Sequence, residues 1–269
     1  MDTILASIKT GYQWAIDSFL LLKKKPFRWA LLAFIYVVLF LGLPASPLTP
    51  VLFNIAIIIT WPIFLVVAIG LFREVDFGRS TGFAELIQQI RPAFKKLAGL
   101  GAICLAYGLF VTIVTKGDAT TLESFATPTN SPLANSSMDL AKVWLILLKF
   151  FALLIPLLMA TWFAPPIIAF QHATVLHAVK SSIAGSLKYA ISLAVAWLVL
   201  TSVMMLVMLM LGIFFGAFAG ALHMQSRLLM GAIMTLSLLL ATSWMLAFQY
   251  ICYRDVFDPV PLGGGEIAM

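Results

Sequence analysis

Residues 29–72 decide the fold, and they read WALLAFIYVVLFLGLPASPLTPVLFNIAIIITWPIFLVVAIGLF. The stretch contains no Asp, Glu, Lys or Arg, and a short turn between Pro44 and Pro50 divides it into two apolar runs. With the two preceding residues included, these runs cover 27–43 and 51–72. A transmembrane helix needs roughly 17–25 predominantly apolar residues to cross the core of a bilayer. The stretch therefore predicts a helical hairpin that crosses a membrane twice.

Similar apolar runs occupy 94–115, 143–163, 189–211 and 228–251. Of the 269 residues, 62% are hydrophobic and only 10% are charged, and the mean hydropathy is +1.05. A soluble domain could not bury that much apolar surface. We therefore predict an all-α polytopic membrane protein with six transmembrane helices in one domain, 1–258, followed by a glycine-containing flexible tail, 259–269.

The basic residues gather on alternate sides of these predicted spans. Thirteen of the 17 Lys and Arg residues fall on the side that holds the N-terminus, and only Lys116, Lys142 and Arg227 fall on the other. By the positive-inside rule, both termini are expected in the cytoplasm, with the first span uncleaved in a bacterial inner membrane. The net charge of +6 thus reflects lysines and arginines beside spans, and we expect no binding to nucleic acid.

An amphipathic segment precedes each odd-numbered span. Apolar residues recur at helical spacing in all three segments: Leu5, Ile8, Tyr12, Ile16 and Phe19; Phe83, Leu86, Ile87, Ile90, Phe94 and Leu97; Leu176, Val179, Ile183 and Leu187. This pattern predicts three cytoplasmic interfacial helices. Thr174 is expected to cap the third helix, and Pro92 is expected to break or kink the second near its end.

The segments also align with one another. Placing Ile16 over Ile87 and Val179 gives offsets of 71 and 163 residues and sets Lys24 over Lys95. We interpret this as a threefold repeat with units 1–72, 73–163 and 164–258, each made of an interfacial helix, a basic turn and a hairpin. The alternative is that any amphipathic stretch beside a membrane carries such a pattern.

Several short motifs follow one another in a familiar order. They are Gly11-Tyr12-Gln13-Trp14, Lys24-Lys25-Pro26, Arg73-Glu74, Gly78-Arg79, Phe163-Ala164-Pro165, Ala178-Val179-Lys180-Ser181 and Tyr253-Arg254-Asp255-Val256-Phe257. In this order the chain resembles a family of uncharacterised proteobacterial inner-membrane proteins related to YciC-type proteins and to the membrane domain of some glycerophosphodiester phosphodiesterases. The resemblance implies an inner-membrane location and a link to lipids. It does not imply the enzyme's activity, because that resides in a separate soluble barrel that no segment here could form.

The sequence offers no visible catalytic set. No Asp or Glu lies in the six predicted spans, and Cys104 and Cys252 lie in apolar segments without metal-ligand spacing. His172 and His177 would point about 140° apart on a helix, and His223 lies on the other side of the membrane. We therefore expect a non-enzymatic protein with no cofactor and no metal.

Two intramembrane features have more than one interpretation. Lys149 could reach the outer interface, could lie in a span that starts later than drawn, or could face a cavity and bind an anionic headgroup or solute. Gly212, Gly216 and Gly220 form a ladder of small residues that would let another helix approach closely. That helix could belong to the same chain or to a second copy in a dimer.

The basic turns are the feature of the sequence that most directly indicates a function. Candidates for binding anionic lipid headgroups are Lys23, Lys24, Lys25, Arg28, Lys95, Lys96 and Lys188, although these charges could act as topological signals alone. Our leading hypothesis is a protein that organises envelope lipids or partner proteins, among them other membrane proteins or copies of itself. The alternative is a permease or channel for small or apolar solutes, with a mid-membrane cavity lined by Lys149 and aromatic residues.

Overall fold

A computed structural model describes residues 2–79, 82–126, 140–222 and 226–258. Within these residues all regular structure is helical, and six segments are long and apolar enough to cross a membrane. The segments are Pro26–Ala45, Val51–Asp76, Phe83–Asp118, Ala141–Phe170, Ala190–Ala217 and Gly231–Phe257. Each overlaps one predicted span, which confirms the all-α fold with six candidate transmembrane helices.

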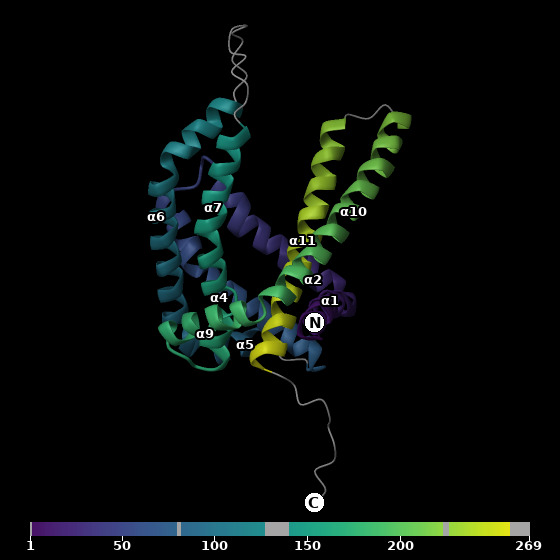
Figure 1. Cartoon of the computed structure of the whole chain (residues 1–269). Coiled ribbons are helices and arrows are strands. Elements are labelled where there is room, and N and C mark those ends of the chain that lie inside the picture. Colours follow the sequence, from purple (N-terminus) through teal and green to yellow (C-terminus); the bar gives the residue numbers. More distant parts are fainter. Residues whose placement is uncertain (1, 80–81, 127–139, 223–225, 259–269) are drawn as a thin grey trace, which may run out of the picture.

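The six segments pair into three hairpins (Figure 1). The first joins α2 (Pro26–Val37), a π-helical stretch η1 (Val38–Gly42) and α3 (Leu43–Ala45) to α4 (Val51–Asp76). The second pairs α6 (Phe94–Ala126) with α7 (Leu140–Thr161), and the third pairs α10 (Ala190–Leu222) with α11 (Ser226–Phe257). The second and third hairpins diverge from each other toward the ends at which their helices are joined.

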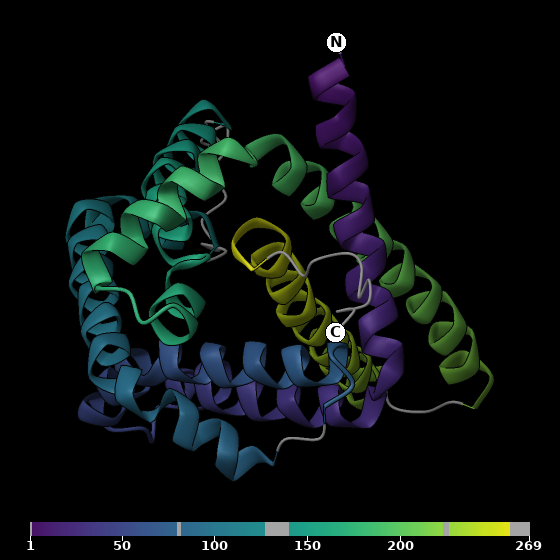
Figure 2. The ribbon, with the colours of Figure 1, turned by 90° about the horizontal axis from the view of Figure 1, so that it is seen from below.

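Three further helices lie across the opposite end of the bundle: α1 (Asp2–Lys24), α5 (Phe83–Ile90) and α9 (Val175–Lys188) (Figures 1 and 2). We call this the basal end, because α11 also finishes there, and the other end distal. One basal helix precedes each hairpin, as the amphipathic segments predicted. The order of basal helix and hairpin therefore occurs three times along the chain.

Local sequence signals account for the ends of these helices. Pro92 lies in a 3-10 turn, η2 (Arg91–Ala93), that separates α5 from α6, as its missing N–H and fixed φ require. Thr174 caps α9, and its Oγ1 accepts a hydrogen bond from the His177 backbone N–H at 3.4 Å. The sequence pattern did not predict α8 (Ala164–Phe170), a short buried helix. Pro165 and Pro166 lie in its first turn, where proline is well tolerated.

Each basal helix packs against a different hairpin, and the three contacts form a ring. α5 packs against α4 of the first hairpin, with Leu86 seated over Gly70. α9 packs against α7 of the second hairpin, where Ser182 Oγ donates to the Met159 carbonyl oxygen at 2.7 Å. α1 packs against α10 and α11 of the third hairpin. The first basal helix thus closes the ring on the last hairpin.

The buried face of each basal helix has the same spacing, four residues and then three. Buried residues with this spacing are Gly11, Ala15 and Ser18 of α1; Leu86 and Ile90 of α5 with Ala93 of η2; and Ala178, Ser182 and Gly185 of α9. Trp14, Leu21, Leu22 and Ser186 are buried beside them. Aligning Gly11 with Leu86 and Ala178 by their burial gives offsets of 75 and 167 residues. These are four residues, about one helical turn, longer than the offsets of 71 and 163 obtained by aligning the apolar residues of the sequence. Several large apolar residues of α1, such as Ile16 and Phe19, are exposed, whereas Trp14 and Leu21 are buried.

The best-packed part of the core lies where α11 approaches the basal end. Phe248, Tyr250 and Tyr253 are fully buried there. The ring of Trp29 stacks on that of Phe72 with 3.9 Å between the centroids. Seen from below, the end of α11 lies within the frame made by the basal helices (Figure 2). The core therefore joins the last span to α1 and to the basal parts of the first hairpin.

Candidate functional site

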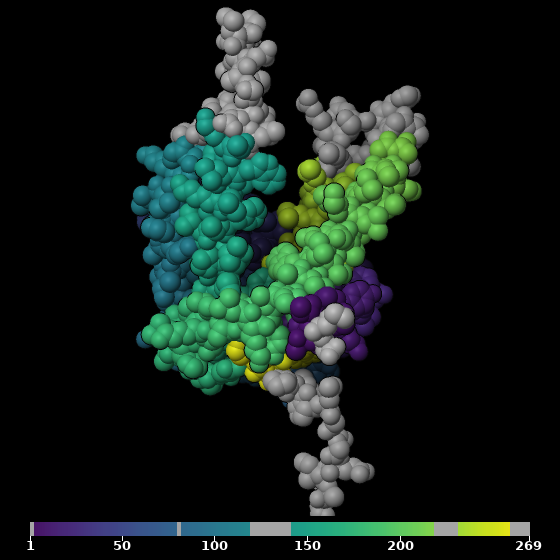
Figure 3. All heavy atoms as spheres, in the orientation of Figure 1, coloured from purple at the N-terminus to yellow at the C-terminus, as the bar shows by residue number. Residues whose placement is uncertain are grey.

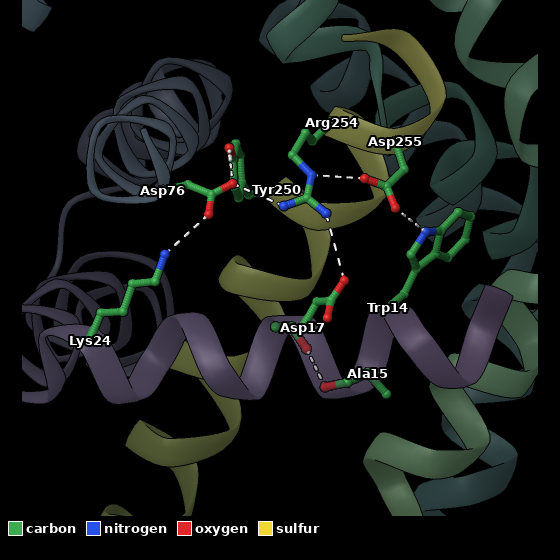
Figure 4. A network of polar contacts seen from close by, with 9 residues as sticks. Trp14, Ala15, Asp17, Lys24, Asp76, Tyr250, Arg254 and Asp255 are labelled. Carbon is green, nitrogen blue, oxygen red and sulfur yellow. Dashed lines mark hydrogen bonds and ion pairs between the residues drawn. The ribbon is translucent and has the colours of Figure 1, made fainter. Parts of the chain in front are cut away.

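A network of polar side chains centred on Arg254 connects three helices at the basal end (Figure 4). The Arg254 guanidinium donates from Nη1 to Asp76 Oδ2 at 2.9 Å and from Nε to Asp255 Oδ1 at 2.8 Å. Its Nη2 lies 3.7 Å from Asp17 Oδ2. One arginine of α11 thus holds carboxylates from α1, α4 and its own helix.

Further donors surround these carboxylates. Asp76 accepts a hydrogen bond from the Tyr250 hydroxyl at 2.9 Å, and its other oxygen lies 3.4 Å from Lys24 Nζ. Trp14 Nε1 donates to Asp255 Oδ2 at 2.9 Å. Trp14 and Asp255 are 241 residues apart in the sequence, and both belong to the motif stretches noted above. The network therefore joins the first unit to the third.

The electrostatics of the network are uneven. Burial raises the pKa of Asp17 above its usual value of 3.8; attraction to Arg254 opposes this rise in part, and repulsion from Asp255 and Asp76 adds to it. Asp76 receives three donors, from Arg254, Tyr250 and Lys24. A carboxylate with several donors is held in its ionised form. In this network each carboxylate lies beside a cation or a hydrogen-bond donor of the protein. Such an arrangement suits a structural clamp between helices better than a site that exchanges protons or binds a substrate.

The seven candidate headgroup ligands all lie at the basal end, but they differ in their partners. Lys24 pairs with Asp76, and Lys96 Nζ donates to the carbonyl oxygens of His172 at 2.9 Å and Ala173 at 3.2 Å. Cations lie over aromatic rings in three cases: Lys23 over Phe19, Arg28 over Trp29 and Lys188 over Tyr189. Lys25 and Lys95 are exposed, without an ion pair or hydrogen bond from their side chains among the described residues.

Lys149 joins the two helices of the second hairpin. Its Nζ is 2.7 Å from Asp118 Oδ2 and donates to the Val114 carbonyl oxygen at 3.1 Å, so the ammonium of α7 is bound by α6. The predicted span ended at residue 115, which left Asp118 outside the membrane and hid this partner. α6 in fact continues to Ala126, and the acid that pairs with Lys149 lies on it.

The glycine ladder of α10 has no neighbour in the described part of the chain. No described heavy atom lies within 4 Å of a Cβ placed at Gly212 or Gly216, so neither packs against another helix in the part of the chain that the structure describes. The surroundings of Gly220 fall outside the described residues, as do those of His223. Gly212 and Gly216 lack a described neighbour because the third hairpin diverges from the second toward this end of α10. The interpretation as a dimer contact stays a prediction.

The histidines do not come together as a metal site. His172 lies in the segment between α8 and α9, whereas His177 is on α9 with its Nε2 3.5 Å from Ser181 Oγ. Among the described residues, no three His, Cys, Asp or Glu side chains are placed to hold a metal ion.

An apolar hollow of about 350 Å³ lies between the hairpins, above the basal end. Its lining residues come from α2, α4, α7, α10 and α11 and from the turn after α7: Tyr36, Trp61, Leu65, Leu158, Thr161, Trp162, Trp197, Leu200, Thr201, Met204, Ala241, Thr242, Met245, Leu246 and Gln249. In the space-filling view, the molecule is recessed between α7 and α10 (Figure 3). Aromatic residues line this cavity as the permease hypothesis required, but Lys149 is not among them.

Comparison of the chain with protein-family models, curated proteins and solved structures found no match. The resemblance to proteobacterial inner-membrane proteins therefore stays a prediction. The structure adds that four of the motif stretches behind it meet at the basal end. Trp14 binds Asp255, Lys24 shares Asp76 with Arg254, and the ring of Phe163 packs on Phe257 at 5.1 Å between centroids.

Proposed function

We propose that this protein is a non-enzymatic, multi-pass protein of the bacterial inner membrane that organises anionic lipids through its basal helices. The observation that carries the proposal is the ring of α1, α5 and α9 at one end of the bundle. α1 and α9 carry large exposed apolar side chains: Leu5, Tyr12 and Phe19 on α1, and Leu176 and Leu187 on α9. Such helices lie at the boundary between headgroups and acyl chains, with their apolar side toward the bilayer.

The charge at this end supports anionic lipids as the ligands. Among the described residues, the ammonium groups of Lys25 and Lys95 have no partner, and Lys23 and Arg28 contact only aromatic rings, so these four cations can all reach a phosphate. Near an anionic leaflet each is worth about 1 kcal/mol. Lys24 and Lys96 differ, because their partners are protein groups. Lipid binding and fold stabilisation are therefore assigned to different lysines.

The test replaces Lys23, Lys25, Arg28 and Lys95 with Gln and leaves Lys24 and Lys96 intact. The protein is placed in nanodiscs of phosphatidylcholine with a minor share of phosphatidylglycerol, and the lipids retained after extraction are counted by native mass spectrometry. We expect the variant to lose retained phosphatidylglycerol and to keep its thermal unfolding midpoint, because none of the four side chains forms an ion pair within the part of the chain that the structure describes.

The matched control is Lys116→Gln, which removes a cation from α6 near the distal end. It should leave phosphatidylglycerol retention unchanged. Equal retention by the wild type and the fourfold variant would reject the proposal.

A further inference from the structure

The apolar hollow lies at the depth of the hydrocarbon core. On α10 its lining runs from Trp197 to Met204, which places it roughly 10–20 Å from the basal end of that helix. On α11 the lining from Ala241 to Gln249 lies roughly 12–24 Å from the last helical residue. A bilayer core is about 30 Å thick, so hydrocarbon surrounds the protein at this level.

The walls of the hollow offer little to a polar ligand. None of its lining residues is charged. Thr161 Oγ1 donates to the Leu157 carbonyl oxygen at 2.8 Å, and Thr201 Oγ1 donates to that of Trp197 at 2.7 Å. Gln249 Nε2 donates to the Trp162 carbonyl oxygen at 2.8 Å. An ion or sugar would lose its hydration here without replacement, whereas an apolar group would not.

Rigid aromatic residues form one wall. Trp162 and Trp197 line the hollow, and their ring centroids are 5.9 Å apart. Both rings also contact that of Phe248, which is buried and does not line the hollow, with 5.8 and 6.2 Å between the centroids. A second hollow of about 400 Å³ adjoins this wall between α7, α9 and α10, and it shares Leu158, Trp162 and Trp197 with the first. The second hollow reaches Ser186 on α9, so the two together extend from the basal end toward mid-membrane.

The geometry points to the pair of hollows as a binding site for one hydrocarbon chain of a membrane phospholipid. Lipid reaches the site sideways, because the second and third hairpins diverge distally and the molecule is recessed between α7 and α10 (Figures 1 and 3). The volumes of the two hollows, about 350 and 400 Å³, lie in the range of small-molecule sites, about 300–1,000 Å³. The site binds the chain and not the headgroup, so it acts independently of the basal lysines in the proposed function.

The experiment uses phosphatidylcholine with a diazirine in one acyl chain, incorporated in nanodiscs with the full-length protein. After irradiation, labelled peptides are mapped by mass spectrometry. Labelling is expected at α10 and α11 residues that line the hollow. Met204→Trp fills the hollow and should reduce this labelling about tenfold, since chain methylenes lose their place. Met205→Trp is the matched control, because Met205 is the next residue and is 77% exposed.

Each outcome decides the proposal. Equal labelling in the two variants, or wild-type labelling confined to outward residues such as Met205, would overturn it. Met245→Trp fills the same hollow from α11 and must reproduce the effect, which guards against a folding defect in Met204→Trp. The fourfold basic variant described above should keep its acyl labelling, because phosphatidylcholine carries no net charge. Loss of phosphatidylglycerol retention and loss of acyl labelling therefore report on separate sites.

Discussion

The basal end and the distal half of the third hairpin are both rich in apolar residues, yet they pack in opposite ways. Tyr250 and Tyr253 near the basal end are 1% exposed, whereas Ile213 and Phe214 in the distal half of α10 are 61% and 66% exposed. In a bilayer, apolar side chains gain little by leaving lipid for another helix. Helices associate where small residues allow close approach or polar groups bond across the contact. The basal end has both features, as Gly11, Ser182 and Arg254 illustrate.

The glycines sharpen this comparison. Gly11 of α1 lies against the backbone of α10, and a Cβ there would overlap the Ser192 carbonyl oxygen. Gly212 and Gly216 have the spacing of a packing motif but no neighbour among the described residues. A small-residue pattern therefore permits close approach without causing it. Whether helices meet depends on where the rest of the fold places them.

The largest effect is expected from Arg254→Gln. This change leaves Asp17, Asp76 and Asp255 close together without the guanidinium that holds them. Removing one partner of a buried ion pair costs about 3–5 kcal/mol, and partial exposure of Arg254 places the expected loss near the lower limit. The thermal unfolding midpoint in detergent measures it. Adding Asp76→Asn should recover part of the loss; an unchanged midpoint for Arg254→Gln would show that the clamp does not stabilise the basal end.

A smaller loss is expected from Gly11→Ala, because the added methyl group forces α1 away from α10. Overpacking of this kind costs about 1–3 kcal/mol. The control is Gly212→Ala, which has open space and should be neutral or stabilising by about 0.5–1 kcal/mol, as alanine favours the helix. Thermal midpoints of the two variants compare the two regions directly. Equal destabilisation would mean that Gly212 does have a neighbour, such as a second copy of the chain.

Lys149→Gln should cost less again. It removes the contact between Lys149 and Asp118 within the second hairpin, where the lysine side chain is 42% exposed. Interhelical polar contacts in membrane proteins are worth about 0.6 kcal/mol on average. The thermal midpoint should fall slightly, and Asp118→Asn should have a similar effect. A loss as large as that of Arg254→Gln would place a buried, functional charge in the second hairpin.

The smallest effect is expected from Asp17→Asn and depends on pH. Burial raises the pKa of Asp17, so the folded protein favours its protonated form more than the unfolded chain does. That stabilisation is present at low pH and disappears as the pH rises through the raised pKa. Relative to the wild type, Asp17→Asn should therefore gain stability as the pH rises from about 4, by less than about 0.5 kcal/mol, because the Asp17 side chain is 45% exposed and solvent screens its charge. A difference with the opposite slope would mean that attraction to Arg254 dominates.

Sequence reasoning found most of the fold and little of the site. Span length and composition predicted six helices, and helical spacing predicted the three basal helices, because these signals depend on neighbouring residues only. The residues of the network were visible as motifs, such as Trp14 and Asp255, but their pairing was not. Asp76 was missed altogether, since nothing local marks an acid at the end of a span as the partner of Arg254.

The sequence by itself determined that the chain belongs in a membrane, how many times it can cross and which three segments form amphipathic helices. It did not fix their ends, because Phe94 and Leu97, counted with the second amphipathic segment, lie in α6. The tertiary structure decided which hairpin each basal helix meets, that α1 closes the ring on α10 and α11, and which residues of each basal helix are buried. It also placed the hollow between hairpins far apart in the chain. The physical reason is that the length of an apolar run and the helical spacing of its residues depend only on residues close in the sequence. Close packing and ion pairing instead need residues as distant as Trp14 and Asp255 to meet.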